Sequence, residues 1–235
     1  MKESTEDRQP ALYLYTPDVD FVRPYFERLM PDLRITESPE AAETAVMLST
    51  VDVYDVSAGT NFNELTPLKR DCGHVSDENG FIGQCKECGL KPTILRCAPI
   101  VGTSMAGMPR ELAEKIYRGT FIGISGNEAR RSVVHAVSLP DAARAVMATG
   151  GIFNVTDTVD PSFNDLAEAL AWRIAQKRIF YMKPKWFSLL FGKKRLINES
   201  VTLTFSCEKL RSFSGFDPVS TVDYLKTHVY DQASL

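Results

Sequence analysis

The chain has 235 residues, 27 basic and 30 acidic side chains, a formal net charge of -3 and 44% hydrophobic residues. This length supports one substantial hydrophobic core, and the near balance of charges excludes the strongly basic surface that nucleic-acid binding requires. No apolar run reaches the length of about 18 residues that a membrane span needs, and the first ten residues lack the features of a secretory signal. Five cysteines, an odd number, fit a reducing compartment, so we expect a cytoplasmic protein without a nucleic-acid partner.

Strand and helix patterns alternate in the first part of the chain. Residues 11–16 (ALYLYT), 33–36 and 45–49 are predicted strands, and apolar side chains at helical spacing predict a helix over residues 21–30. Ser38 followed by Pro39 indicates the start of a short helix between the second and third strands. This alternation is typical of a parallel α/β sheet.

Residues 56–89 turn to Gly, Asn, Asp and Cys, which predicts long loops around at most one short helix. Ser162 is a candidate N-cap for the longest predicted helix, at residues 161–174. The remaining predicted elements follow the same patterns. They are strands at 92–97, 133–136 and 151–154, and helices at 110–117, 139–148 and 221–226.

Six phrases occur in a characteristic order. They are LSTVDVYD (48–55), TILRCAPIVG (93–102), RSVVHAVSLPDAARAV (131–146), GGIFNVTD (150–157), the helix after Ser162, and LRSFSGFDPVSTVDYL (210–225). In this order they resemble the extended short-chain dehydrogenase/reductase family, the NAD-dependent sugar-nucleotide epimerases and dehydratases. The segment KWFSLLFGKKR is most similar to members that reduce 4-keto amino-sugar nucleotides for surface polysaccharides.

The resemblance implies an α/β fold with a shortened Rossmann-like parallel sheet flanked by helices, and a smaller C-terminal α/β substrate lobe. It divides the chain into a tail (1–10), a truncated NAD(P)-binding Rossmann-like domain (11–102) and a substrate-side lobe interleaved with the sheet (103–235). It also implies the roles of several residues. Thr50 takes the catalytic hydroxyl position, Lys86 the signature lysine, and Arg131 the contact to the substrate diphosphate. The stretch beside the nicotinamide of the NAD(P) cofactor comprises Pro99, Ile100 and Val101.

Two features that this chemistry requires are missing. The family binds the cofactor pyrophosphate with a glycine-rich turn and a helix N-terminus, but residues 17–24 read PDVDFVRP. Pro17 has no amide donor, and Asp18 and Asp20 bring negative charge to an anionic ligand. Ile82 stands at the position of the catalytic tyrosine and cannot transfer a proton. The short distance from the first strand to Thr50 also implies that one or two β-α units are gone. We therefore expect NAD(P) binding to be opposed and oxidoreductase activity to be lost or much reduced, with residual nucleotide-sugar binding.

Other functions remain open from the sequence. The chain is alternatively a non-catalytic structural or regulatory partner, forming a homodimer or pairing with an intact paralogue. A small zinc site is a further alternative, and its candidate ligands are Cys72, His74, Cys85 and Cys88. The basic and aromatic residues 183–195 fit an anionic membrane surface, although a lid or core helix near the substrate is favoured over membrane association.

Overall fold

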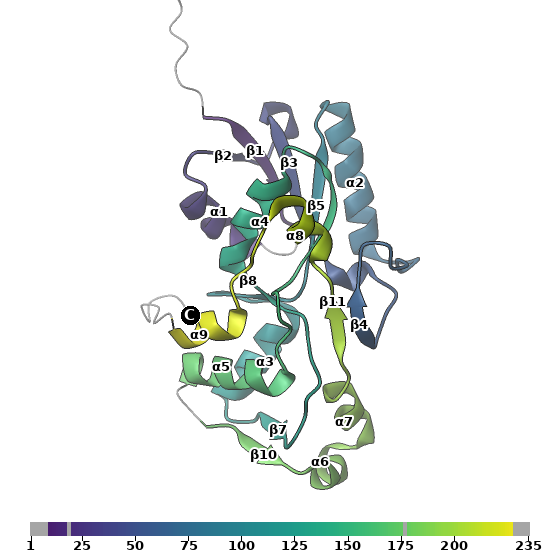
Figure 1. Cartoon of the computed structure of the whole chain (residues 1–235), viewed down its shortest axis with the longest axis vertical. Coiled ribbons are helices and arrows are strands. Elements are labelled where there is room, and N and C mark those ends of the chain that lie inside the picture. Colours follow the sequence, from purple (N-terminus) through teal and green to yellow (C-terminus); the bar gives the residue numbers. More distant parts are fainter. Residues whose placement is uncertain (1–8, 18–19, 176–177, 228–235) are drawn as a thin grey trace, which may run out of the picture.

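The computed structural model describes residues 9–17, 20–175 and 178–227. The predicted tail at 1–10 falls almost entirely outside these ranges, and Asp18 falls outside them too. The described residues form two lobes along the long axis of the molecule, with the main sheet in one lobe and mostly helices in the other (Figure 1). In these ranges no helix is long and apolar enough to cross a membrane.

Five described strands form a fully parallel sheet, with the order β2-β1-β3-β5-β9. Their bounds are β1 (Ala11–Tyr15), β2 (Arg34–Thr36), β3 (Thr44–Thr50), β5 (Pro92–Cys97) and β9 (Gly151–Val155). The strands predicted at these places are confirmed. Their apolar runs identified them because a parallel sheet is covered on both faces and its strands are hydrophobic throughout.

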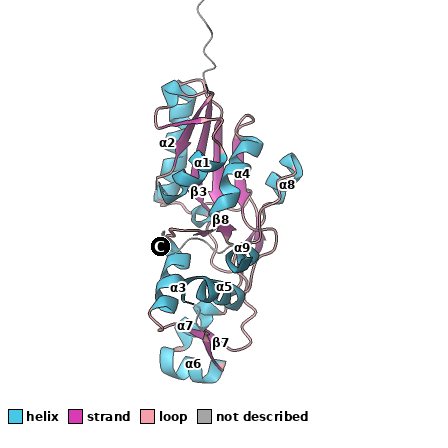
Figure 2. Ribbon diagram, turned by 90° about the vertical axis from the view of Figure 1, so that its left-hand side faces the viewer, coloured by secondary structure: helices cyan, strands magenta, loops and turns pink. Residues whose placement is uncertain are grey.

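Side chains along each strand alternate between two separate cores. Leu12 and Leu14 of β1 face a core shared with the helices α1 (Arg23–Leu29), α4 (Leu139–Val146) and α8 (Glu208–Ser214). Tyr13, between them, faces the opposite core, where it stacks on Phe81 of α2 (Gly73–Glu87). The sheet is therefore sandwiched between α2 on one face and the other three helices on the other face (Figure 2).

The prediction of long loops at residues 56–89 was wrong. This segment contains the strand β4 (Gly59–Phe62) and the 15-residue helix α2, which is longer than the 13-residue helix α5 (Phe163–Ala175) that was expected to be the longest. The helical signal was weak because three glycines interrupt α2 and its buried residues are Glu78, Phe81 and Cys85. A face of this kind, which includes a charged side chain, does not show the apolar periodicity of an amphipathic helix.

The sheet is shorter than a classic dinucleotide-binding sheet, whose strands run 3-2-1-4-5-6. Only residues 37–43, with the 3-10 helix η2 (Pro39–Ala41), connect β2 to β3, and β2 is the edge strand. On the other side of β1 the sheet continues with β3, and Tyr13 of β1 lies opposite Ala45. The observed order corresponds to strands 2-1-4-5-6 of the classic sheet, and the described residues contain no counterpart of strand 3 beyond the edge strand β2.

The second lobe has its own core, built by α3 (Gly107–Tyr117), α5 and α9 (Thr221–Thr227). Ser162 caps α5 as predicted, since its Oγ accepts a hydrogen bond of 3.1 Å from the Asp165 amide. The remaining elements of this lobe and its junction with the sheet are short. They are β6 (Ile100–Val101) paired with β8 (Val134–His135), β7 (Ile122–Ile124) with β10 (Phe180–Met182), β4 with β11 (Leu203–Phe205), and the helices α6 (Pro184–Phe191) and α7 (Lys193–Glu199).

Candidate functional site

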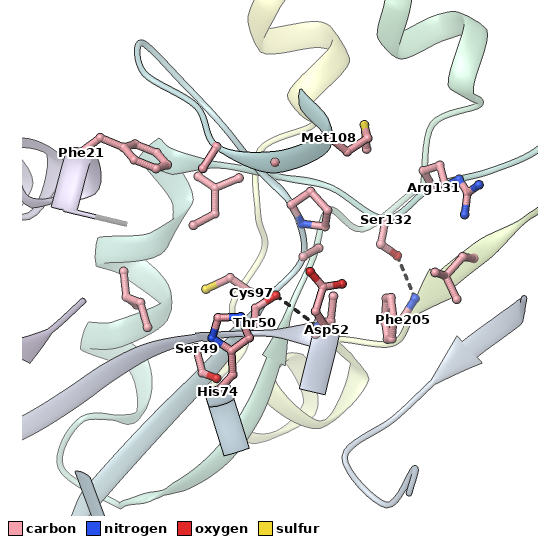
Figure 3. Close-up of a pocket in the computed structure, with 18 of the residues that line it drawn as sticks. Phe21, Ser49, Thr50, Asp52, His74, Cys97, Met108, Arg131, Ser132 and Phe205 are labelled. Carbon is pink, nitrogen blue, oxygen red and sulfur yellow. Dashed lines mark hydrogen bonds between the residues drawn. The ribbon is translucent and has the colours of Figure 1, made fainter. Parts of the chain in front are cut away.

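A pocket of about 480 Å³ lies between the two lobes, at the carboxyl ends of β1, β3 and β5. The chain runs from β1 to β2 on one side and then crosses to β3 on the other side, so the direction of strand order reverses at β1. Ligands of open α/β sheets bind in the crevice at such a switch point. The lining is mostly apolar, and the polar groups sit at a few places on its wall (Figure 3). This combination is typical of a small-molecule site.

Thr50 lines the pocket from the last position of β3 (Figure 3). Its Oγ1 accepts a hydrogen bond of 3.1 Å from the amide of Asp52, in the following 3-10 helix η3 (Val51–Val53), so Thr50 caps that helix. Asp52 itself is exposed and also lines the pocket. The hydroxyl that the sequence identified is thus held at the pocket wall by the turn that ends its strand.

Arg131 lines the same pocket from the second lobe and is half-buried. Its Nη2 donates a hydrogen bond of 2.7 Å to the Asn198 carbonyl, and burial lowers the pKa of the guanidinium without bringing it near neutrality. In the described part of the chain, no carboxylate forms an ion pair with Arg131. An unpaired, half-buried guanidinium at a pocket is ready to bind an anion, because the ligand then supplies the missing negative charge.

The other expected site residues divide between the pocket and the rest of the molecule. Pro99 and Ile100 line the pocket, whereas Val101 is buried in the core of the second lobe. Ile82 and Lys86 lie in the later turns of α2, and Lys86 is exposed to solvent. Among the residues of α2, all of which the structure describes, His74 alone lines the pocket.

The expected position of Lys86 in the cleft is therefore corrected. At a rise of about 1.5 Å per residue, Lys86 lies about 18 Å along the helix axis from His74. The match to the lysine signature relied on residue types, but α2 already begins at Gly73, so only its first turn reaches the pocket.

A buried network of polar side chains contacts the pocket wall through Ser49. Glu78 and Arg96 are 3–4% exposed and form a salt bridge of 2.7 Å, and Ser49, which lines the pocket, donates a hydrogen bond of 2.7 Å to Glu78. Arg96 also donates to the Tyr54 hydroxyl at 3.2 Å, and that hydroxyl donates to Asn154 at 2.6 Å. The network joins β3, α2, β5 and β9. In the sequence this network is indicated by an arginine inside a buried strand. A buried arginine requires a charged partner, but the sequence does not identify which residue that is.

Cys97 is a further pocket residue at the end of β5. Burial raises the pKa of its thiol to about 12. This shift disfavours the thiolate form that a nucleophilic cysteine requires.

The connection from β1 to α1 does not fit a dinucleotide pyrophosphate. Pro17 and Phe21 line the pocket from this connection, and Thr16 donates a hydrogen bond of 2.7 Å to the carboxylate of Asp20, in the turn that precedes α1. A proline, an aromatic ring and a carboxylate thus occupy the place where backbone amides would have to hold two phosphates. Asp20 also places like charge against them, and we derive no chemical step through this cofactor.

The zinc alternative is contradicted by the positions of its four candidate ligands. Cys72 and His74 lie at the start of α2, and Cys85 and Cys88 lie at its end. These two pairs are separated by about 20 Å along the helix, so they do not converge on one ion, whose bonds are about 2.0–2.3 Å long. Within the described residues, no group of three or more histidine, cysteine or acidic side chains has the geometry of a metal site.

No protein-family model and no curated protein matches the sequence. Solved structures do match. The chain is similar to a UDP-N-acetylglucosamine 4-epimerase from Bacillus cereus at 11% identity and a TM-score of 0.65, covering 94% of this chain and 100% of that one. It is similar to RMD from Pseudomonas aeruginosa complexed with NADPH at 15% identity and a TM-score of 0.59, covering 94% and 81% of the two chains. A UDP-glucose 4-epimerase from Thermotoga maritima with UDP-glucose has 21% identity and a TM-score of 0.55, with 80% and 62% covered. At these identities the likeness establishes the fold, and the predicted Rossmann-like α/β architecture is confirmed.

Proposed function

We propose that this chain is a diverged member of the NAD-dependent epimerase/dehydratase family that binds a nucleotide sugar without the cofactor-dependent redox step. The observation that carries this proposal is Arg131, a half-buried cation without a carboxylate partner at the switch-point pocket. One of the similar structures contains UDP-glucose, a ligand of the proposed class.

The pocket offers separate surfaces for the parts of such a ligand. Arg131 and Lys115 are the cationic side chains of its lining, and they suit a diphosphate. Met108 and Phe163 provide apolar surface in the same lobe for the flat face of a base or the hydrophobic face of a sugar ring. Thr50 and Asp52, at the end of β3, provide polar groups for sugar hydroxyls.

Redox chemistry lacks two of its requirements in this pocket. The β1–α1 connection opposes a dinucleotide, and among the described residues no tyrosine belongs to the pocket lining. The ionisable side chain that α2 brings to the pocket is the imidazole of His74. We therefore propose binding as the retained function and assign no reaction to the pocket.

Thermal unfolding with UDP, UDP-glucose and UDP-N-acetylglucosamine tests the proposal, because a ligand of the native state raises the melting temperature by mass action. We expect stabilisation of the wild type and, for Arg131→Ala, binding that is weaker by about 10- to 100-fold, the usual range for a charged hydrogen-bonded contact. The matched control is Arg130→Ala, since Arg130 is outside the pocket lining and donates to the Asp160 carbonyl at 2.6 Å.

Two results would contradict the proposal. One is the absence of stabilisation by any of these nucleotides at millimolar concentration, which would favour the alternative of a non-catalytic partner. The other is equal stabilisation of the wild type and Arg131→Ala. Titration with NADPH, followed by its fluorescence, tests the redox part separately, and binding at micromolar concentration would reject the loss of the cofactor site.

A further inference from the structure

The helices α6 and α7 form the end of the molecule that lies farthest from the sheet (Figures 1 and 2). The sequence favoured a lid or a core helix for residues 183–195. None of these residues lines the pocket, whereas Asn198 and Glu199, the last two residues of α7, do. The rest of α6 and α7 projects away from the pocket.

The outer face of α6 is apolar and exposed. Trp186, Leu189 and Leu190 are 56%, 72% and 64% exposed, and their i, i+3, i+4 spacing places them on one side of the helix. Phe187 is fully buried on the other side, where its ring lies 4.9 Å from that of Phe191. The helix is thus anchored by its inner face and presents bulky apolar side chains outward.

The following helix also exposes a large apolar side chain. Ile197 of α7 is 61% exposed, and the guanidinium of Arg195 packs over the rings of Phe187 and Phe191 at 5.3 and 4.7 Å, which ties α7 to the inner face of α6. We call Trp186, Leu189, Leu190 and Ile197 the apical patch. Four large apolar side chains exposed on two consecutive short helices are unusual on a solvent-facing surface.

Basic side chains surround the apical patch. Lys183, Lys185, Lys193 and Lys194 are all exposed, and residues 178–198 include no Asp or Glu, although the whole chain has a net charge of -3. Glu199, the first acidic residue after this stretch, is paired with Arg195 at 2.7 Å. In the described residues no salt bridge involves any of the four lysines. The occupant of this surface must therefore be both apolar and negatively charged.

We propose that the apical patch docks the protein on an anionic lipid bilayer surface. Trp186 would lie at the depth of the headgroups, where tryptophan is enriched, and Leu189 and Leu190 would enter the upper acyl region. The lysines would contact the headgroups through their flexible stems, each strengthening partition by about fivefold near an anionic surface. A second copy of the chain fits this surface poorly, because a twofold interface would place the two lysine clusters against each other.

This docking does not depend on nucleotide-sugar binding. It would nevertheless bring the pocket close to the bilayer, because α7 reaches from the lysines at its start to Asn198 and Glu199 at the pocket, and seven residues span about 10 Å. The membrane contact would be peripheral.

Flotation of the full chain with lipid vesicles tests the proposal. We expect binding to phosphatidylcholine vesicles that contain about 30% phosphatidylserine, little binding to pure phosphatidylcholine, and weaker binding at high salt. Leu189→Glu/Leu190→Glu should abolish flotation, and Lys193→Gln/Lys194→Gln should weaken partition by about 25-fold. The matched controls are Leu65→Glu, at a leucine that is 90% exposed elsewhere, and Lys91→Gln/Lys226→Gln; both should bind like the wild type.

A fluorescence measurement separates insertion from simple charge adsorption. The chain has two tryptophans, so Trp172→Phe leaves Trp186 as the reporter, and its emission should shift to the blue when anionic vesicles are added. The proposal is overturned by any of three results: no flotation with anionic vesicles, flotation without the blue shift, or a dimer in solution that Leu189→Glu/Leu190→Glu dissociates. Circular dichroism of each variant confirms that the helices are intact.

Discussion

Replacement of the buried Glu78 by glutamine should strongly destabilise the protein. Glu78 accepts three hydrogen bonds, two from Arg96 at 3.0 and 2.7 Å and one from Ser49 at 2.7 Å. Glu78→Gln preserves the shape of the side chain but leaves a guanidinium that is 3% exposed without its counter-charge, with the Tyr54 hydroxyl as a remaining acceptor. Removing one partner of a buried ion pair costs about 3–5 kcal/mol. This is a large part of the total stability of about 5–15 kcal/mol that is usual for a domain.

The assay is urea unfolding followed by far-UV circular dichroism and, as a second probe, tryptophan fluorescence. Coincident transitions would justify a two-state free energy of unfolding for this two-lobed chain. Glu114→Gln is the control, because Glu114 is 48% exposed and its ion pair with Arg110 should contribute at most about 0.5 kcal/mol.

A double variant separates the orphaned charge from lost packing. Glu78→Gln/Arg96→Met removes the buried guanidinium together with its partner, so it should be less destabilised than the sum of the two single variants by 1 kcal/mol or more, on the order expected for coupled neighbours. A cost below about 1 kcal/mol for Glu78→Gln, or strict additivity in the double variant, would refute the account of this network.

Three further predictions concern the second lobe and its junction with the sheet. Burial raises the pKa of Asp157 from 3.8 to about 7, although the hydrogen bonds from Thr221 act in the opposite direction. Because the folded state binds this proton more tightly than the unfolded state, the contribution of Asp157 to stability is complete below about pH 4 and is lost as the pH rises through 7. Across this range the free energy of unfolding of the wild type should fall by up to about 4 kcal/mol relative to that of Asp157→Asn, as measured by urea titrations at stepped pH. Parallel plots of the free energy of unfolding against pH for the two proteins would contradict this. Ser162→Ala removes the cap of α5 and should cost about 1 kcal/mol in the same assay, whereas no loss would mean that the cap contributes nothing. Gly123→Ala should cost about 1–3 kcal/mol, because a Cβ there would lie 2.4 Å from the Tyr181 ring, and unchanged thermal stability would show that β10 can move aside.

The elements that the sequence predicted well are those whose burial is local and apolar. The strands β1, β3 and β5 are continuous apolar runs, and α3, α4 and α5 have regular apolar faces, so residue type and spacing were sufficient. The helix α2 was missed because a salt bridge to Arg96 fixes part of its buried face. The periodicity of hydrophobic residues does not reveal a buried helix face that is stabilised by a polar partner on another element.

The same distinction applies to the pocket. Thr50 and Pro99 follow strand ends, and in a parallel sheet the strand ends meet at one edge, so their place at the pocket could be predicted once the strands were known. His74 could not be assigned in this way, because its place depends on where α2 begins. The motif match pointed instead to Lys86, twelve residues further along the helix.

The two lobes can diverge independently because each has a separate hydrophobic core. Leu12 and Leu14 belong to the core of the sheet, whereas Val133, two residues from Arg131, belongs to the core of the second lobe with α3 and α5. A change in the strands or in the β1–α1 connection would therefore alter one core and leave the support of Arg131 intact. If the cofactor site and the substrate site shared one hydrophobic core, loss of the elements that build the cofactor site would also unfold the substrate site. The β1–α1 connection, which does not fit a dinucleotide pyrophosphate, packs on one core, and the unpaired cation of the pocket is supported by the other.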